Sequence, residues 1–217
     1  MPSLFEQPYS LITVLCLLSL LPLLVVMGTT FLKLAVVLSL LRSALGIQQL
    51  PPNMAIYGLS LILTLFIMAP IGLAISDHLE KQPLDWQSPQ LFQRLDKQVL
   101  QPYRQFLNQH TDPKQICFFN QIGQQIWPEQ YRERLPKDSL LVLMPAFTLS
   151  QLVEAFKIGL LLYLPFIAID LIVSNTLLAM GMMMVSPMTI ALPFKLLVFI
   201  LIDGWQKLLN QLVLSYT

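Results

Sequence analysis

Charged residues are scarce in this sequence, and their scarcity excludes an ordinary soluble protein. Only 12% of the 217 residues are charged, whereas soluble domains carry roughly 25%. Hydrophobic residues make up 55% of the chain, and the mean hydropathy is +0.66. The uncharged runs from Gln7 to Leu32 and from Ser43 to Ser76 each exceed the roughly 20 residues that a helix needs to cross a bilayer. The composition therefore indicates a membrane protein.

The chain also lacks an excess of either charge sign and has few cysteines. Its net charge of +1 leaves no basic face for nucleic acid. Cys16 and Cys117 are its only cysteines, so we expect ordinary thiols rather than a disulfide framework. The first ten residues contain Glu6 but no Lys or Arg, unlike the start of a cleavable signal peptide. We expect the first helix to be retained.

Motifs for common catalysis are missing. The sequence contains no GxxxxGK[ST], GxGxxG, HExxH or paired CxxC pattern, so nucleotide hydrolysis and metal chemistry lack their usual residues. His78 and His110 are the only histidines and have no ligand pattern beside them, which disfavours a metal site. An internal repeat typical of alternating-access carriers is also lacking. We therefore expect no enzyme activity and no cofactor.

Apolar segments flank one polar insert. The N-terminal region, residues 1–76, holds an apolar block from Leu11 to Leu41, either one bent helix or two short ones, and a helix from Met54 to Ile75. The insert, residues 77–138, holds 16 of the 25 charged residues, and its apolar spacing predicts two or three short amphipathic helices. The pattern predicts an all-α fold of hydrophobic helical hairpins with a small soluble helical insert.

The C-terminal region, residues 139–217, is apolar but contains prolines and isolated charges. We expect its helices to be broken by four prolines, Pro145, Pro165, Pro187 and Pro193. Charges and unpaired backbone groups are tolerated at membrane depth where protein or water surrounds them, because hydrocarbon offers them no partner. The pattern therefore predicts an assembly of several chains.

The charges of this region allow two interpretations. Glu154 and Lys157 are spaced i,i+3, whereas Asp170 and Lys195 stand alone in apolar surroundings. They form either structural ion pairs between helices or subunits, or an ion or proton relay. Because a chain of several acids and histidines is missing, we favour ion pairs.

Four methionines gather at one turn-like position, around Gly181 and just before Pro187. They are Met180, Met182, Met183 and Met184. Flexible thioethers either fill gaps in a core or form a deformable seal around a hole. Copies arranged in a ring would make such a seal continuous.

The positive-inside rule gives a topology. Lys33 and Arg42 flank the turn between the first two apolar segments, and nothing comparable lies near the N-terminus. That turn would face the cytoplasm, and the insert would lie on the periplasmic side.

Long ordered blocks of the chain resemble the FliP/SctR family, the R component of the type III secretion export apparatus. The blocks are FLKLAVVLSLLRSALGIQQLPPNMAIYG (Phe31 to Gly58), PAFTLSQLVEAFKIG (Pro145 to Gly159), LPFIAIDLIVSN (Leu164 to Asn175) and LAMGMMMVSPMTIALPFKLLVF (Leu178 to Phe199). The missing signal peptide points to the injectisome type rather than the flagellar type.

The resemblance implies a pentameric ring of R subunits that S and T subunits complete into an export gate of the bacterial inner membrane, in contact with other export components. It implies that unfolded substrates pass through this gate and that Met182, Met183 and Met184 project into the pore as a gasket. Glu154, Lys157, Asp170 and Lys195 would build interfaces. Two alternatives stay open: an ion channel or carrier subunit that uses Asp170 and Asp203, and a scaffold that conducts nothing.

Overall fold

The protein is described by a computed structural model that covers residues 8–47, 51–81, 99–132 and 139–216. Across these residues the chain is helical and forms no strand, which confirms the all-α prediction. The helices are α1 (Pro8–Gly28), α2 (Phe31–Leu45), α3 (Asn53–Lys81), α5 (Gln101–Gln109), α6 (Pro113–Ile126), α7 (Glu129–Arg132), α8 (Leu140–Ala179), α9 (Pro187–Leu201) and α10 (Gly204–Leu214). Residues 1–7, whose lack of Lys and Arg entered the signal-peptide prediction, lie outside this description.

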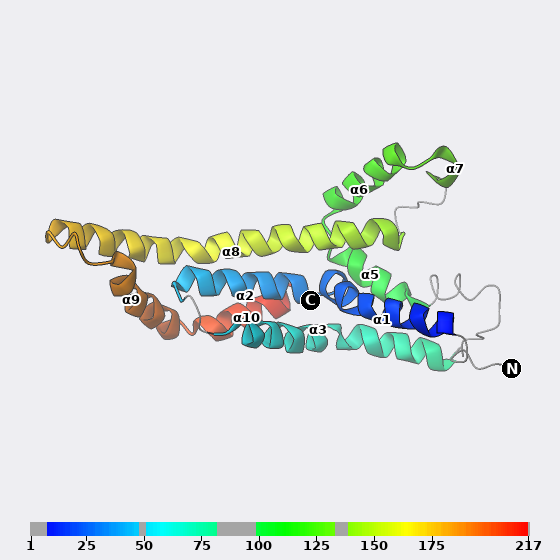
Figure 1. The fold of residues 1–217 in the computed structure, drawn as a ribbon, viewed down its shortest axis with the longest axis horizontal. Coiled ribbons are helices and arrows are strands. Elements are labelled where there is room, and N and C mark those ends of the chain that lie inside the picture. Colours follow the sequence, from blue (N-terminus) through cyan, green and yellow to red (C-terminus); the bar gives the residue numbers. More distant parts are fainter. Residues whose placement is uncertain (1–7, 48–50, 82–98, 133–138, 217) are drawn as a thin grey trace.

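The molecule is elongated along α8 (Figure 1). Helix α2 runs beside α8, and α3 lies on the other side of α2. Helix α9 folds back from the C-terminal end of α8, and α6 and α7 project near its N-terminal end. The amphipathic helices expected for the insert are thus α5, α6 and α7, while residues 82–98 and 133–138 of the insert lie outside the described chain. Helix α3 continues to Lys81, so the expected boundary at residue 77 falls within a helix.

The first apolar block forms two helices, which Thr29 and Thr30 separate. Side chains from two distant helices bond to the last carbonyls of α1. The Tyr103 hydroxyl donates to the Gly28 carbonyl at 2.7 Å, and the Thr148 hydroxyl donates to the Met27 carbonyl at 3.0 Å. Burial raises the pKa of Tyr103 to about 12, so this hydroxyl stays protonated and able to donate. Helix α2 then begins at Phe31.

Helix α8 is continuous through Pro145 and Pro165, so the breaks expected at these prolines are wrong. Each proline removes one backbone donor, but the residues next to it are held by packing. Ala146 and Phe147 are fully buried beside Pro145, and Phe166 is buried beside Pro165. Tertiary contacts next to both prolines therefore keep α8 continuous where the local sequence favours a break.

Pro193 lies inside α9, so the break expected at this proline is also wrong, and breaks occur instead at the two ends of α9. Pro187 is the first residue of α9, where a missing N–H costs nothing because the first turn has no partner for it. At the other end α9 and α10 meet at a bend of 61°, and Asp203 takes a left-handed backbone conformation there, with φ at 53°. An added Cβ on the next residue, Gly204, would overlap with the Phe199 ring, so the bend is tightly packed.

Two clusters of buried side chains hold the helices together. The larger centres on one face of α2, with Leu34, Val37 and Leu41 completely buried against α3, α8, α9 and α10. The smaller joins α5, α8 and the C-terminal Tyr216 around Phe147. Both clusters lie around α2 and the first half of α8, and the far end of α8 carries mostly exposed apolar side chains.

Two described helices are long and apolar enough to cross a membrane. They are Asn53–Glu80 and Leu140–Ala179, and the bent pair α9 and α10 adds a third if it counts as one span. Only 11% of the most apolar window in each is buried inside the chain. The remaining apolar surface must be covered by lipid or by other protein, because water solvates it poorly.

Candidate functional site

The methionine cluster lies in the turn between α8 and α9, at the end of the molecule farthest from the insert (Figure 1). Helix α8 ends there in a Schellman motif. The Met182 N–H donates to the Leu177 carbonyl and the Gly181 N–H donates to the Leu178 carbonyl, each at 3.0 Å. Gly181 has φ at +75°, which glycine adopts without the steric penalty of a Cβ. The start of the turn is therefore a defined structure.

The three consecutive methionines extend from this turn with little contact to the chain. Met182 is 44% exposed, Met183 is 82% exposed, and Met184 is fully exposed. Gap-filling in this chain's own core is therefore not what these side chains do. Exposed thioethers at the tip of a capped turn are free to contact another molecule.

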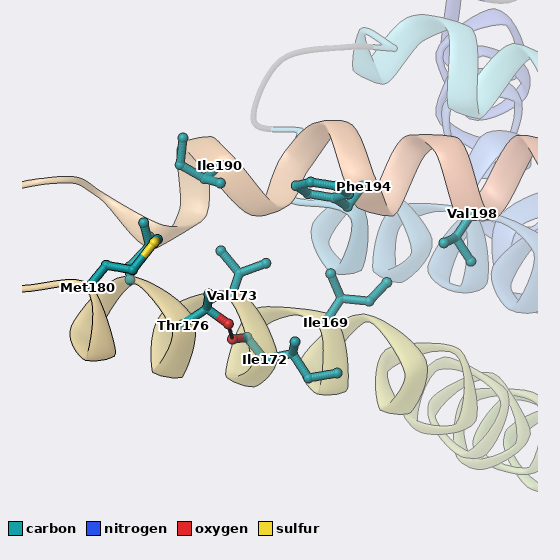
Figure 2. A pocket seen from close by; sticks show the side chains of 9 residues that line it. Ile169, Ile172, Val173, Thr176, Met180, Ile190, Phe194 and Val198 are labelled. Carbon is teal, nitrogen blue, oxygen red and sulfur yellow. Dashed lines mark hydrogen bonds between the residues drawn. The ribbon is translucent and has the colours of Figure 1, made fainter. Parts of the chain in front are cut away.

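An apolar pocket of about 450 Å³ lies behind the turn, between the second half of α8 and α9. Figure 2 shows Ile169 and Val173 of α8 opposite Phe194 of α9, with Met180 at the end next to the turn. The only hydroxyl in its wall, that of Thr176, donates to the Ile172 carbonyl at 2.8 Å and so needs no further acceptor. The pocket therefore offers an apolar surface beside the methionines.

Lys195 fastens the two helices that carry the turn. Its ammonium, in a side chain only 5% exposed, lies 2.7 Å from the Asp170 carboxylate of α8. It also donates to the Ala44 carbonyl, at the C-terminal end of α2, at 3.2 Å. Cations are favoured at the C-terminal end of a helix because its last carbonyls carry a partial negative charge. Lys195 thus joins α2, α8 and α9.

Glu154 pairs with Lys33, which the sequence pattern indicated only as a topology signal. The Lys33 ammonium of α2 lies 2.7 Å from Glu154 and 3.0 Å from the Ser215 hydroxyl. It also lies 4.7 Å from the centre of the Tyr216 ring. Lys33 is 2% exposed. The only sign of this pair in the sequence is that Lys33 lies within an apolar block, where a buried cation needs a partner.

The other predicted charges are not brought together. Lys157, three residues after Glu154, is exposed and has no ion pair within the part of the chain that the structure describes. Asp203 is exposed at the bend between α9 and α10. Among the described residues no group of three His, Cys, Asp or Glu side chains could hold a metal ion. Glu154 and Asp170 thus belong to two separate ion pairs, and no continuous relay connects them within the described chain.

Comparison with known proteins adds an independent observation. The model of the FliP family matches residues 14–212. The chain is 56% identical over 207 residues to the Yop proteins translocation protein R of Yersinia pestis, covering 95% of each chain. It is 55% identical over 215 residues to the virulence protein YscR of Salmonella typhimurium, covering 99% of this chain and all of the relative.

More distant relatives share nearly the same length. The harpin secretion protein HrcR of Erwinia amylovora is 45% identical over 199 residues, with 92% of each chain covered. The family match and these identities extend over all three regions of the sequence. The chain therefore belongs to the FliP family, as its resemblance to the R component of type III secretion predicted.

Proposed function

We propose that this chain is a core subunit of the export gate of a bacterial type III secretion system, and that it forms the pore through which unfolded proteins pass. The observation that carries the proposal is the exposed run Met182, Met183 and Met184 at the tip of a capped turn. The relatives named as translocation and secretion proteins support the same role.

The methionines would act as a gasket. Thioether side chains are apolar and flexible and have no strong hydrogen-bond demand, so they can close on one another at rest and on varied side chains during export. One subunit cannot enclose a channel with a single turn. The proposal therefore requires a ring of copies, a pentamer in our proposal, completed by S and T subunits and by contacts with other export components.

The exposed apolar surface supports this assembly. The second half of α8 and the facing side of α9 leave large apolar side chains uncovered, among them Leu171, Ile172 and Leu201. Continuous apolar patches of this kind mark contacts with protein or lipid. We place the assembly in the inner membrane, with the insert on the periplasmic side, because the cation Arg42 at the end of α2 lies beside the opposite turn, where it donates to the side chain of Asn53.

The pairing of Asp170 favours this role over that of an ion channel or carrier. Its carboxylate lies 2.7 Å from the Lys195 ammonium, so it is committed to a structural pair rather than free to bind a transported ion. A conduit also needs no catalytic step of its own. Energy for export would come from other components of the apparatus.

The test is to replace Met182, Met183 and Met184 together by alanine. Loss of the bulky thioethers should leave a gap, so the gate reconstituted in a planar bilayer should conduct small ions at rest. The assembled complex, purified in mild detergent, should keep its native mass.

The matched control replaces the same three residues by leucine, which keeps apolar volume, and should leave resting conductance close to that of the native gate. If the triple alanine variant assembles and stays closed, the gasket assignment is wrong.

A further inference from the structure

A second, polar cavity lies at the opposite part of α8 from the methionine turn. It has a volume of about 290 Å³ and is lined by residues of α2, α8, the turn between α5 and α6, and the C-terminal end of the chain. Its lining includes Lys33, His110, Asp112, Gln151, Glu154 and Tyr216. The pore proposal does not use this cavity.

Hydrogen bonds hold the wall of the cavity in place. The Tyr216 hydroxyl donates to Gln151 Oε1 at 2.5 Å, and Gln151 Nε2 donates to the His110 carbonyl at 2.9 Å. The Asp112 N–H donates to the Ser150 hydroxyl at 3.0 Å. Gln151 is 1% exposed. The lining is therefore built from fixed side chains and is not a chance gap at the surface.

His110 lines the cavity and keeps one ring nitrogen as an unused acceptor. Its Nδ1 lies 2.9 Å from the Phe106 carbonyl, which can only accept, so the neutral ring carries its proton on Nδ1 and a lone pair on Nε2. The imidazole is held by the Phe106 ring at 4.5 Å and the Tyr216 ring at 5.4 Å between centroids. Among described residues Nε2 has no hydrogen-bond donor.

The carboxylates of the cavity also have spare acceptors. Glu154 uses one oxygen for Lys33, and Asp112 uses one for the Lys114 N–H at 2.9 Å. The second oxygen of each has no donor within the described chain. Because two carboxylates and one lysine line the cavity, and the lysine ammonium is already paired with Glu154, the lining carries an excess of one negative charge.

We propose that this cavity binds an ammonium or guanidinium group. Three spare acceptors and the negative excess fit a cation with several N–H donors, whereas an anion would meet two carboxylates and a lysine that is already paired. The group can come from a free small amine or from a Lys or Arg side chain of a neighbouring subunit. The inference does not depend on the pore proposal.

The chain's two histidines allow a direct test. In protein labelled with ¹⁵N at histidine, in mild detergent at pH 8, ethylammonium chloride is titrated in. The Nε2 resonance of His110 should shift saturably, whereas that of the exposed His78 should not. Tetramethylammonium, which has the same charge but no N–H, should leave both resonances unchanged at equal ionic strength.

Two variants separate the cavity from general charge effects. Asp112→Asn removes one charge but keeps the cap of α6, because asparagine caps helices as well as aspartate. This substitution should raise, at least fivefold, the ethylammonium concentration that gives half of the maximal shift of the His110 Nε2 resonance. Asp203→Asn removes an exposed charge outside the cavity, at a left-handed position that asparagine tolerates. It should leave that concentration unchanged.

Cross-linking distinguishes the two sources of the cation. A photo-reactive residue in place of Gln109, at the exposed rim of the cavity, is placed in the assembled secretion apparatus. Cross-links to a segment of another chain that contains Lys or Arg assign the cavity to a basic side chain. A resonance shift without such cross-links assigns it to a free amine. If neither the shift nor such cross-links occur, or if Asp112→Asn responds as the native chain does, the proposal is overturned.

Discussion

At the scale of residues, the ion pair of Lys33 and Glu154 is unequal. The lysine is 2% exposed, whereas the side chain of Glu154 is 45% exposed. A buried ammonium without a counter-ion cannot recover its hydration, but a half-exposed carboxylate can turn to solvent. The buried partner therefore depends on the exposed one more than the reverse.

This asymmetry predicts unequal effects of substitution. Glu154→Leu should lower the free energy of unfolding by about 3–5 kcal/mol, because it leaves a buried charge unpaired. Lys33→Met should cost less, and combining both substitutions should recover much of the loss caused by Glu154→Leu. Denaturant unfolding of the purified chain in mild detergent measures all three variants. Equal losses for the two single variants would show that Lys33 is not the dependent partner.

At the scale of helices, close approach between α2 and α8 positions the rest of the molecule. Gly159 of α8 faces Leu40 of α2 so closely that an added Cβ would overlap with the Leu40 side chain. Rotating the end of that leucine would not relieve the contact, because its Cβ and Cγ would still lie 3.2 Å away. The helices approach this closely only because residue 159 has no side chain.

Gly159→Ala should therefore destabilise the chain by about 1–3 kcal/mol through overpacking. Gly58 of α3 is the matched control, because an added Cβ there meets nothing within 4 Å. Gly58→Ala should stabilise the helix by about 0.5–1 kcal/mol, since alanine has the higher helix propensity. Thermal unfolding in detergent compares the two. A stabilising effect of Gly159→Ala would show that α2 and α8 can move apart freely.

At the scale of the whole molecule, the exposed charge on α8 bears on the assembly that we propose. Lys157 lies among exposed apolar side chains, with Phe156, Leu160 and Leu161 beside it, and has no ion pair within the described chain. A lone cation on an apolar face of a helix that spans a membrane is costly, by about 2.5–3.5 kcal/mol at its centre. A partner from another subunit would remove that cost.

Lys157→Met should therefore leave the folding of the single chain intact but reduce the fraction that assembles. Native mass measurement of the complex extracted in mild detergent gives that fraction, and circular dichroism checks the fold. Lys114→Met, which removes an exposed charge from the insert, should assemble normally. Full assembly of Lys157→Met would exclude a role for this lysine between subunits.

The turn at the methionines shows which structural features the local sequence determines without tertiary contacts. Gly181 and Pro187 fix the end of α8 and the start of α9, because a left-handed cap and a first-turn proline are properties of those residues themselves. The prediction of a methionine turn could therefore be made without a structure. Helix α8 shows the opposite, since Pro145 and Pro165 favour a break locally and packing against other helices prevents it.

The sequence by itself determined the helical class, the apolar and polar regions, and the place of the methionine turn, because these follow from composition and from the backbone preferences of single residues. Only the tertiary structure decided that Glu154 pairs with Lys33 rather than with Lys157, which is three residues away. The cavity beside His110 likewise exists only where four segments meet. The energy of a charge depends on the atoms packed around it, and packing brings those atoms from distant parts of the chain.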